Sequence, residues 1–219
     1  MNTAKGLSLD QVRLGLDGRE LLAVDHFVAP GEVLTVMGPS GSGKSTLLAY
    51  VGGFLDPVFS AEGHVRVDGL NLTTLPAEER HVGILFQDPL LFPHMSVGGN
   101  LLFAIPQDVK GRSRRMEIAE AALAGVGLGG MAARDPDTLS GGQKARVALA
   151  RVLVSAPRTL LLDEPFSKLD ADLRSQVRKL VFQKACDSGL PVLLVTHDEA
   201  DAKAAGGAVI KVGTQNGGS

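Results

Sequence analysis

Two patterns of apolar residues run along the chain, and in the first of them apolar and polar positions alternate. This alternation covers residues 7–16, and a second strand-like stretch over 20–28 follows the dipeptide Asp17-Gly18. Alternation is typical of a half-buried strand, and Asp-Gly between two such stretches is typical of a hairpin turn. We therefore expect an antiparallel hairpin near the start of the chain. A further short strand is expected over 63–69.

The second pattern consists of short, continuous apolar runs, which lie at 33–37, 82–86, 159–163 and 191–196. Stretches with helical spacing of apolar residues separate them, most clearly over 112–124, 140–154 and 173–184. Continuous apolar runs that alternate with helices are typical of a parallel sheet covered on both faces. The predicted fold class is therefore α/β, with a mostly parallel sheet and an antiparallel β subdomain at the N-terminal side.

The run GPSGSGKST follows the first continuous apolar run and opens a predicted helix. It fits G-x-x-x-x-G-K-[ST], a loop whose glycines let successive backbone N–H groups point at phosphate oxygens. Lys44 is expected to reach the outer phosphates, and the Ser45 hydroxyl is expected to bind Mg²⁺. The residues expected to cradle the phosphates are Gly38, Pro39, Ser40, Gly41, Ser42, Gly43, Lys44, Ser45 and Thr46.

Two carboxylates, Asp163 and Glu164, end the apolar run at 159–163. Side chains at the carboxyl ends of parallel strands line the ligand crevice of such a sheet. Asp163 is expected to hold Mg²⁺, and Glu164 is expected to accept a proton from an attacking water. An acid pair that caps a turn before Pro165 is the alternative interpretation, and the phosphate loop in the same chain favours the functional one.

A second glycine-rich helix start is found in the run LSGGQ. Ser140 and Gln143 fit the S-x-x-Q capping box, in which two side chains satisfy the first free N–H groups of a helix. Helix starts of this kind bind anions, so Ser140, Gly141, Gly142 and Gln143 form a second phosphate-receptive element.

Composition excludes several classes of protein. The chain has 219 residues, a net charge of −2 and one cysteine, so it has no basic field for a nucleic-acid backbone and no pair of cysteines for an internal disulfide. The stretch 89–107 carries no formal charge, but three prolines interrupt it. We expect it to form a loop and a short helix rather than a membrane span.

Taken together, these motifs resemble the ATP-binding cassette (ABC) family over nearly the whole chain. GPSGSGKST, Gln87, LSGGQ, LLLDEP, the run 167–170 and His197 occur in the family's order and rough spacing. The most similar members are short cassettes of bacterial binding-protein-dependent importers, of the thiamine type and the YnjD-like group. The resemblance implies a P-loop NTPase core with an inserted helical subdomain at roughly 88–155, in a single cassette over 1–219 with no C-terminal regulatory domain.

The resemblance also implies roles for single residues. Ser45 and Gln87 would bind Mg²⁺ with support from Asp163, Glu164 would be the general base, and His197 would contact the γ-phosphate. The LSGGQ residues would close on the ATP of a second copy in a head-to-tail dimer. Residues near 88–101 would receive a cytoplasmic helix of a transmembrane permease subunit, and an extracytoplasmic substrate-binding protein would belong to the same system.

Two positions depart from the family pattern. The family places an aromatic ring on adenine from the region before the phosphate loop, whereas this chain has Leu14-Gly15-Leu16 there. We therefore expect aliphatic contact with the base at best, at a loss of about 1 kcal/mol of affinity. Lys168 replaces the small residue that is common in the loop at the dimer seam.

The function expected from these features is the ATP-hydrolysing subunit of a membrane transporter, peripheral to the cytoplasmic face of the cell membrane. A soluble cassette ATPase outside transport is the alternative, although the chain lacks the coiled-coil insertions and second cassette usual in that group. A P-loop kinase or GTPase is a third possibility. The LSGGQ run and the lack of an N-K-x-D guanine-reading motif argue against it.

Overall fold

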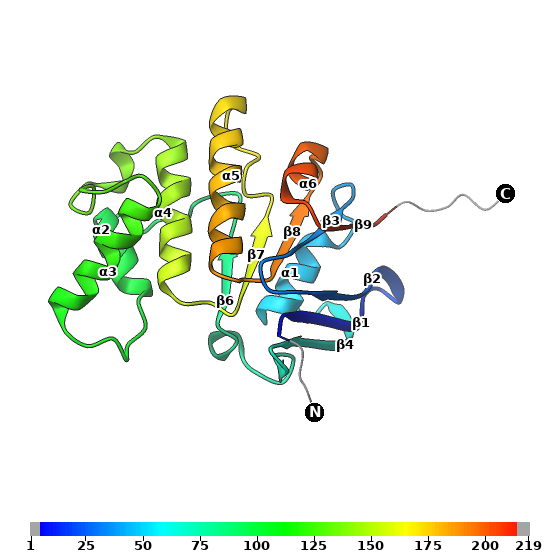
Figure 1. Cartoon of the computed structure of the whole chain (residues 1–219). Coiled ribbons are helices and arrows are strands. Elements are labelled where there is room, and N and C mark those ends of the chain that lie inside the picture. Colours follow the sequence, from blue (N-terminus) through cyan, green and yellow to red (C-terminus); the bar gives the residue numbers. More distant parts are fainter. Residues whose placement is uncertain (1–4, 214–219) are drawn as a thin grey trace. The chain divides into compact units, whose positions relative to one another are not determined.

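The computed structural model describes residues 5–213 of the chain, which divide into two units (Figure 1). The first unit contains the described residues up to 82, the segment 158–164 and the residues from 184 onward. The second unit contains 83–157 and 165–183. Each unit has its own set of helices and strands.

An antiparallel sheet forms one layer of the first unit. Its strands are β1 (Leu7–Leu16), β2 (Arg19–Val28), β4 (Phe59–Val67) and β5 (Leu70–Asn71), in the order β2-β1-β4-β5. Asp17 and Gly18 both have positive φ, at 52° and 75°, which is the geometry of a type I′ hairpin turn. The predicted hairpin is therefore confirmed.

Strand β4 differs from its predicted range of 63–69 because it begins at Phe59. The residues Phe59 to Glu62 pair with β1, although this half of the strand is mostly exposed and has no alternating pattern. Gly63, with φ of 85°, lies where the register with β1 shifts. Backbone pairing with β1, rather than side-chain burial, extends the strand.

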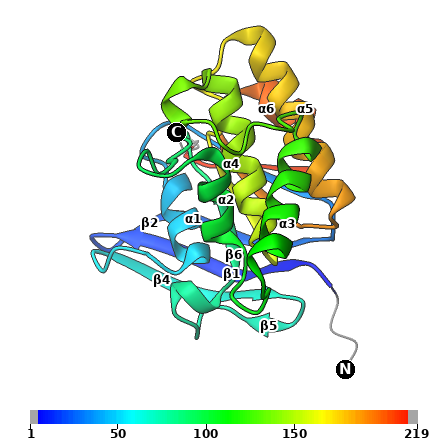
Figure 2. The ribbon, with the colours of Figure 1, turned by 90° about the vertical axis from the view of Figure 1, so that its left-hand side faces the viewer.

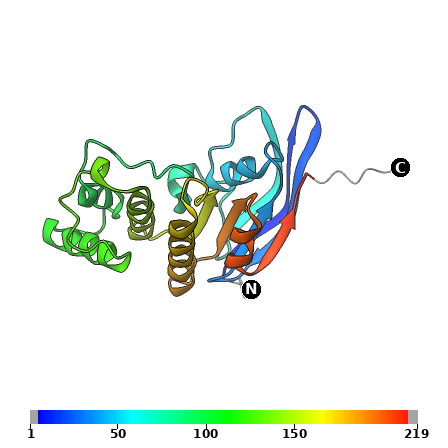
Figure 3. The ribbon, with the colours of Figure 1, turned by 90° about the horizontal axis from the view of Figure 1, so that it is seen from above.

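A parallel sheet forms the other layer of the first unit. Strands β7 (Thr159–Asp163), β8 (Val192–Thr196), β3 (Val33–Met37) and β9 (Ala208–Lys211) lie side by side in that order. All residues of β3 and β8 are buried, as their continuous apolar sequences predict. Helices α1 (Lys44–Gly52) and α6 (Glu199–Ala205) lie on opposite sides of these strands (Figure 3), so the predicted sheet covered on both faces is confirmed.

The second unit is mainly helical. It contains β6 from its second residue (Val82–Leu85), α2 (Val97–Ala104), α3 (Arg112–Gly125), α4 (Gly141–Val154) and most of α5 (Ala171–Asp187). Helices α2, α3 and α4 pack on one another (Figure 2), and fully buried side chains such as Leu101, Leu123 and Leu149 form their common core. Short 3₁₀ turns lie at Ala77–Glu79 in the first unit and at Pro136–Thr138 in the second.

The capping box at the start of α4 is confirmed. The Gln143 N–H donates to the Ser140 hydroxyl over 3.3 Å, and the Ser140 N–H donates to the Gln143 side-chain oxygen over 2.9 Å. Both bonds satisfy N–H groups that the helix itself leaves without acceptors. The helix therefore begins at Gly141, which is exposed, whereas Gly142 is buried.

Two polar side chains, the buried Asn100 and the half-buried Arg151, hold the loop that precedes α2. Asn100 is fully buried, accepts the Phe92 N–H over 2.8 Å and donates to the Phe92 carbonyl over 3.1 Å. Arg151 on α4 donates to the Leu90 carbonyl over 2.7 Å and to the Pro89 carbonyl over 3.0 Å. These bonds satisfy backbone groups of the uncharged stretch 89–107, which forms a proline-broken loop and a short helix as predicted. Over the described residues, the helices are too short or too polar to cross a membrane.

Candidate functional site

The phosphate loop lies between β3 and α1 in the first unit, as its sequence predicts. Gly43 has φ of 85° and forms the N-cap of α1, which begins at Lys44. A side chain at Gly43 would bring a Cβ to 3.2 Å from the Leu21 Cβ on β2. Both the left-handed backbone and the nearby leucine therefore require glycine here.

Lys44 is largely buried, and its ammonium group lies inside the loop. Its Nζ donates to the Gly38 carbonyl over 2.8 Å and to the Pro39 carbonyl over 2.7 Å. These bonds fold the lysine back over the loop backbone. An ammonium group has three donors and rotates freely, so it can exchange these carbonyls for phosphate oxygens without moving the main chain.

Ser45 on α1 meets Asp163 at the end of β7. The Ser45 hydroxyl donates to Asp163 Oδ1 over 3.2 Å. Burial raises the pKa of the Asp163 carboxyl and the nearby Glu164 adds to this, whereas the Ser45 hydrogen bond and Lys44 act in the opposite direction. A hydroxyl and a carboxylate are hard oxygen donors, which is the ligand type that Mg²⁺ takes.

Glu164 and His197 lie in contact beside this pair. His197 Nδ1 is 3.0 Å from Glu164 Oε1, at the ends of β8 and β7 respectively. Glu164 has a φ of 45° and donates its N–H to the Val195 carbonyl over 3.0 Å. A left-handed backbone at a residue other than glycine stores strain and is found most often at functional sites. Sequence reasoning singled out both residues but gave no sign of this strained backbone.

A hollow of about 370 Å³ runs from the phosphate loop toward the antiparallel sheet. Its loop side is lined by Ser40, Gly41, Gly43, Lys44, Ser45 and Thr46, with Glu164 beside them. Three apolar side chains of the antiparallel sheet, Leu16, Leu21 and Phe59, also line it. The volume lies within the range of small-ligand pockets. Phe59 was missed by sequence reasoning because the start of β4 has no recognisable strand pattern.

The LSGGQ residues and Gln87 belong to the second unit. Ser140 and Gly141 are exposed at the tip of α4, whereas Gly142 is buried, and a Cβ there would lie 2.4 Å from a Leu173 methyl group. Glycine at this position therefore lets the start of α5 pack against α4.

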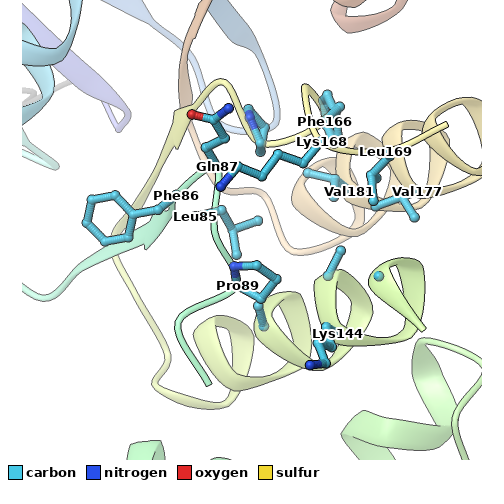
Figure 4. A pocket seen from close by; sticks show the side chains of 14 residues that line it. Leu85, Phe86, Gln87, Pro89, Lys144, Phe166, Lys168, Leu169, Val177 and Val181 are labelled. Atoms are coloured by element: carbon cyan, nitrogen blue, oxygen red, sulfur yellow. The ribbon is translucent and has the colours of Figure 1, made fainter. Parts of the chain in front are cut away.

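Gln87 lines a mostly apolar hollow of about 170 Å³ in the same unit (Figure 4). Leu85, Phe86, Phe166, Val177 and Val181 are among its other lining residues. Lys168 also lines it and forms an ion pair with Asp88 at 2.5 Å, between two exposed side chains. The lysine in the predicted seam loop thus has a partner within its own unit.

The geometry of the first unit supports one kind of chemistry. A lysine and a serine in a glycine loop, facing carboxylates at the ends of parallel strands, can bind a nucleoside triphosphate and direct water at its last phosphate. These features define a P-loop nucleotide hydrolase. The chain belongs to the ABC transporter family, which it matches over residues 21–167, and it is an ATP-binding cassette ATPase.

Several relatives carry the same assignment over most of the chain. The chain is 47% identical over 188 residues to the uncharacterized ABC transporter ATP-binding protein YnjD of Escherichia coli K12, with 86% of each chain covered. It is 44% identical over 198 residues to the thiamine import ATP-binding protein ThiQ of Cereibacter sphaeroides, covering 90% of this chain and 84% of the relative. The resemblance to the ABC family is therefore confirmed.

A longer relative and a solved structure agree with this. The Fe(3+) ions import ATP-binding protein FbpC 1 of Rhizobium meliloti is 43% identical over 183 residues, and the match covers 84% of this chain but 51% of that relative. The cassette MJ0796, in a dimeric post-hydrolysis state bound to ADP and Pi, is similar with a TM-score of 0.76 at 30% identity, covering 94% of each chain. The predicted α/β cassette fold is confirmed.

We predict that Asp163→Asn makes the nucleotide-free protein more stable at about pH 7 but not at about pH 4. Because the folded protein raises the pKa of Asp163, it binds more protons than the unfolded chain between the usual and the raised pKa, so stability falls as pH rises through that interval. The asparagine keeps an oxygen for Ser45 but carries no buried charge. Urea unfolding at the two pH values measures the difference.

The matched control is Asp25→Asn, at an exposed position of β2 in the same unit. This variant should unfold like the unaltered protein at both pH values. A lower unfolding midpoint for Asp163→Asn at about pH 7 would contradict a destabilising buried charge at this site.

Proposed function

We propose that this chain is the ATP-hydrolysing subunit of a bacterial binding-protein-dependent importer. The observation that supports this best is the joint placement of the phosphate loop, Ser45–Asp163 and Glu164–His197 in one unit. Importer subunits for thiamine and Fe(3+) ions among its relatives favour transport over a soluble cassette ATPase. Hydrolysis would drive alternating access in partner subunits.

The proposed reaction is attack of a water molecule on the γ-phosphorus of ATP, which breaks the bond to the β–γ bridging oxygen and releases ADP and phosphate. Glu164 accepts the proton of that water, and His197, held by Glu164 at 3.0 Å, contacts the γ-phosphate and keeps the geometry. Lys44 exchanges its two loop carbonyls for outer phosphate oxygens and stabilises the charge that develops on them. The loop N–H groups hold the remaining phosphate oxygens.

Mg²⁺ fits the oxygen donors of Ser45 and Asp163. Their 3.2 Å contact places a hydroxyl and a carboxylate where one ion can replace the hydrogen bond between them. The ion would supply charge neutralisation at the phosphates. Gln87 as a further ligand stays a prediction from the family resemblance.

The exposed tip of α4 supports a dimer of two cassettes. We propose that Ser140, Gly141, Gly142 and Gln143 of one copy close on the nucleotide bound by the phosphate loop of the other. Ser140 and Gly141 are exposed at a helix start, where an anion is favoured, and the capping box fixes this start. The dimeric state of the similar cassette MJ0796 agrees with such an assembly.

A hydrophobic surface in the second unit fits a helix of a permease subunit. The loop that Asn100 and Arg151 hold carries Leu90, which is 57% exposed, and α2 carries Phe103, which is 66% exposed. The Phe103 ring packs edge-on against Phe92 at 5.0 Å between centroids. Exposed apolar side chains on a rigid frame are typical of a groove for an amphipathic helix. In the proposed system the chain lies at the inner face of the cell membrane and works with an extracytoplasmic substrate-binding protein.

Lys44→Ala is expected to abolish most ATPase activity, because the outer phosphates lose their cation. Phosphate release assays on the purified chain measure the loss. Arg19→Ala is the control, since it removes an exposed positive charge of β2 in the same unit. Unchanged turnover of Lys44→Ala would contradict the assignment of the phosphate loop.

Glu164→Gln is expected to retain ATP binding and to slow hydrolysis by about 10²- to 10⁴-fold, because the amide cannot accept the proton of the attacking water. The variant should also accumulate as an ATP-bound dimer in size-exclusion chromatography. Glu20→Gln, an exposed change on β2, should behave like the unaltered chain. A monomeric Glu164→Gln protein with normal turnover would rule out the role of general base.

Phe103→Asp is expected to weaken co-purification of the chain with its polytopic membrane subunit while leaving ATP binding intact. A charge at a position that is 66% exposed does not disturb the core, so the loss would come from the docking surface. Phe27→Asp, at a position 43% exposed in the other unit, is the control and should retain the membrane subunit. Equal recovery with both variants would place the docking surface elsewhere.

A further inference from the structure

The far side of the nucleotide hollow contains an aromatic ring that the sequence analysis did not expect. Phe59 is the first residue of β4 and is paired with Leu16, the last residue of β1. Directly paired residues on antiparallel strands place their side chains on the same face of the sheet, with Cβ atoms about 5 Å apart. Both side chains line the hollow that begins at the phosphate loop.

A bulge in β2 brings a third apolar side chain to the same wall. Leu14 pairs with Leu22 and Gly15 pairs with Glu20, so Leu21 is the extra residue between two registers. Bulges redirect the extra side chain, and they are frequent next to active sites. Leu21 is directed at the loop, because a Cβ built at Gly43 would lie 3.2 Å from the Cβ of Leu21. The bulged residue Leu21 therefore lies next to the phosphate loop and lines the hollow together with Leu16 and Phe59.

The position of this wall relative to the loop decides what it can contact. A triphosphate held by Lys44 and the loop N–H groups leaves the sugar and base to extend out of the loop along the hollow. The hollow of about 370 Å³ continues from the loop to Leu16, Leu21 and Phe59. An aromatic ring flanked by two leucines offers a planar, apolar surface of the kind on which nucleobases stack.

We propose that Phe59 of β4 is the residue on which the adenine of ATP stacks, with Leu16 and Leu21 completing the contact. The proposal rests on the proposed ATP-binding function and adds the residue that recognises the base. It also explains how the chain binds a nucleotide without an aromatic residue at 14–16. The expectation of aliphatic contact alone considered only residues that precede the loop, whereas the ring comes from a strand that follows it.

The test compares a ligand that has a base with one that has only phosphates. Phe59→Ala in the full chain should weaken ATP binding about tenfold, because the stacking contact is lost. Its affinity for inorganic tripolyphosphate should not change, because the loop is intact. Isothermal titration with Mg²⁺ present measures both affinities. Phe27→Ala, which removes a half-exposed ring from the same antiparallel sheet but outside the hollow, should change neither.

A second variant reports stacking directly and does not depend on a loss of affinity. The chain contains no tryptophan, so Phe59→Trp gives a single indole fluorophore at the proposed position. ATP should quench its emission, and tripolyphosphate should not. Phe27→Trp should respond to neither ligand. The pair of tryptophan variants keeps the test valid if Phe59→Ala is poorly folded.

The possible failures are distinguishable. If Phe59→Ala binds ATP as tightly as the unaltered chain, and the emission of Phe59→Trp is the same with ATP and with tripolyphosphate, the stacking role is overturned while ATP binding stands. If the unaltered chain binds neither ligand, the proposed function is overturned, and the base contact with it. Loss of both ligands in folded Phe59→Ala would show that the ring supports the loop rather than the base, which also overturns the proposal.

Discussion

The parallel pairing of β3, β8 and β7 is the constraint on which the site depends. It brings three strand ends to one edge, so that the loop after β3, the carboxylates after β7 and the histidine after β8 meet although they lie far apart in the sequence. The Ser45–Asp163 and Glu164–His197 contacts follow from this arrangement. Asp163, Glu164 and His197 lie at the ends of β7 and β8, which contain no exposed residue, so these side chains are positioned before any nucleotide binds.

Strain and burial at this edge have a common explanation. Glu164 is held in a left-handed conformation by its bond to the Val195 carbonyl, and Asp163 keeps its carboxyl in a site that raises its pKa. Both features lower the stability of the empty protein and suit a site that is completed by a cation and phosphates. The free energy of binding the cation and the phosphates can then offset the strain at Glu164 and the burial of the Asp163 carboxyl.

The sequence predicted the elements whose side chains are buried in regular patterns. The hairpin, the parallel strands, the phosphate loop and the capping box of α4 all follow from local rules, and the structure agrees with them. Three features do not follow: the ring of Phe59, the backbone of Glu164 and the ion pair of Lys168 with Asp88. Each depends on a partner distant in sequence. The first half of β4 is held by backbone bonds to β1, and such bonds require no alternation of apolar and polar side chains.

Helix α4 has a mechanical consequence. Its first turn is the LSGGQ tip, and Arg151, about 15 Å further along the axis, holds the carbonyls of Pro89 and Leu90. Helix α4 thus joins the LSGGQ tip, which we propose closes on a twin cassette, to the loop that we propose receives a permease helix. In the proposed importer, a shift of the tip on ATP binding would be transmitted along this helix to the loop at the permease. Loss of the Arg151 hydrogen bonds would then uncouple ATP hydrolysis from transport in the proposed importer.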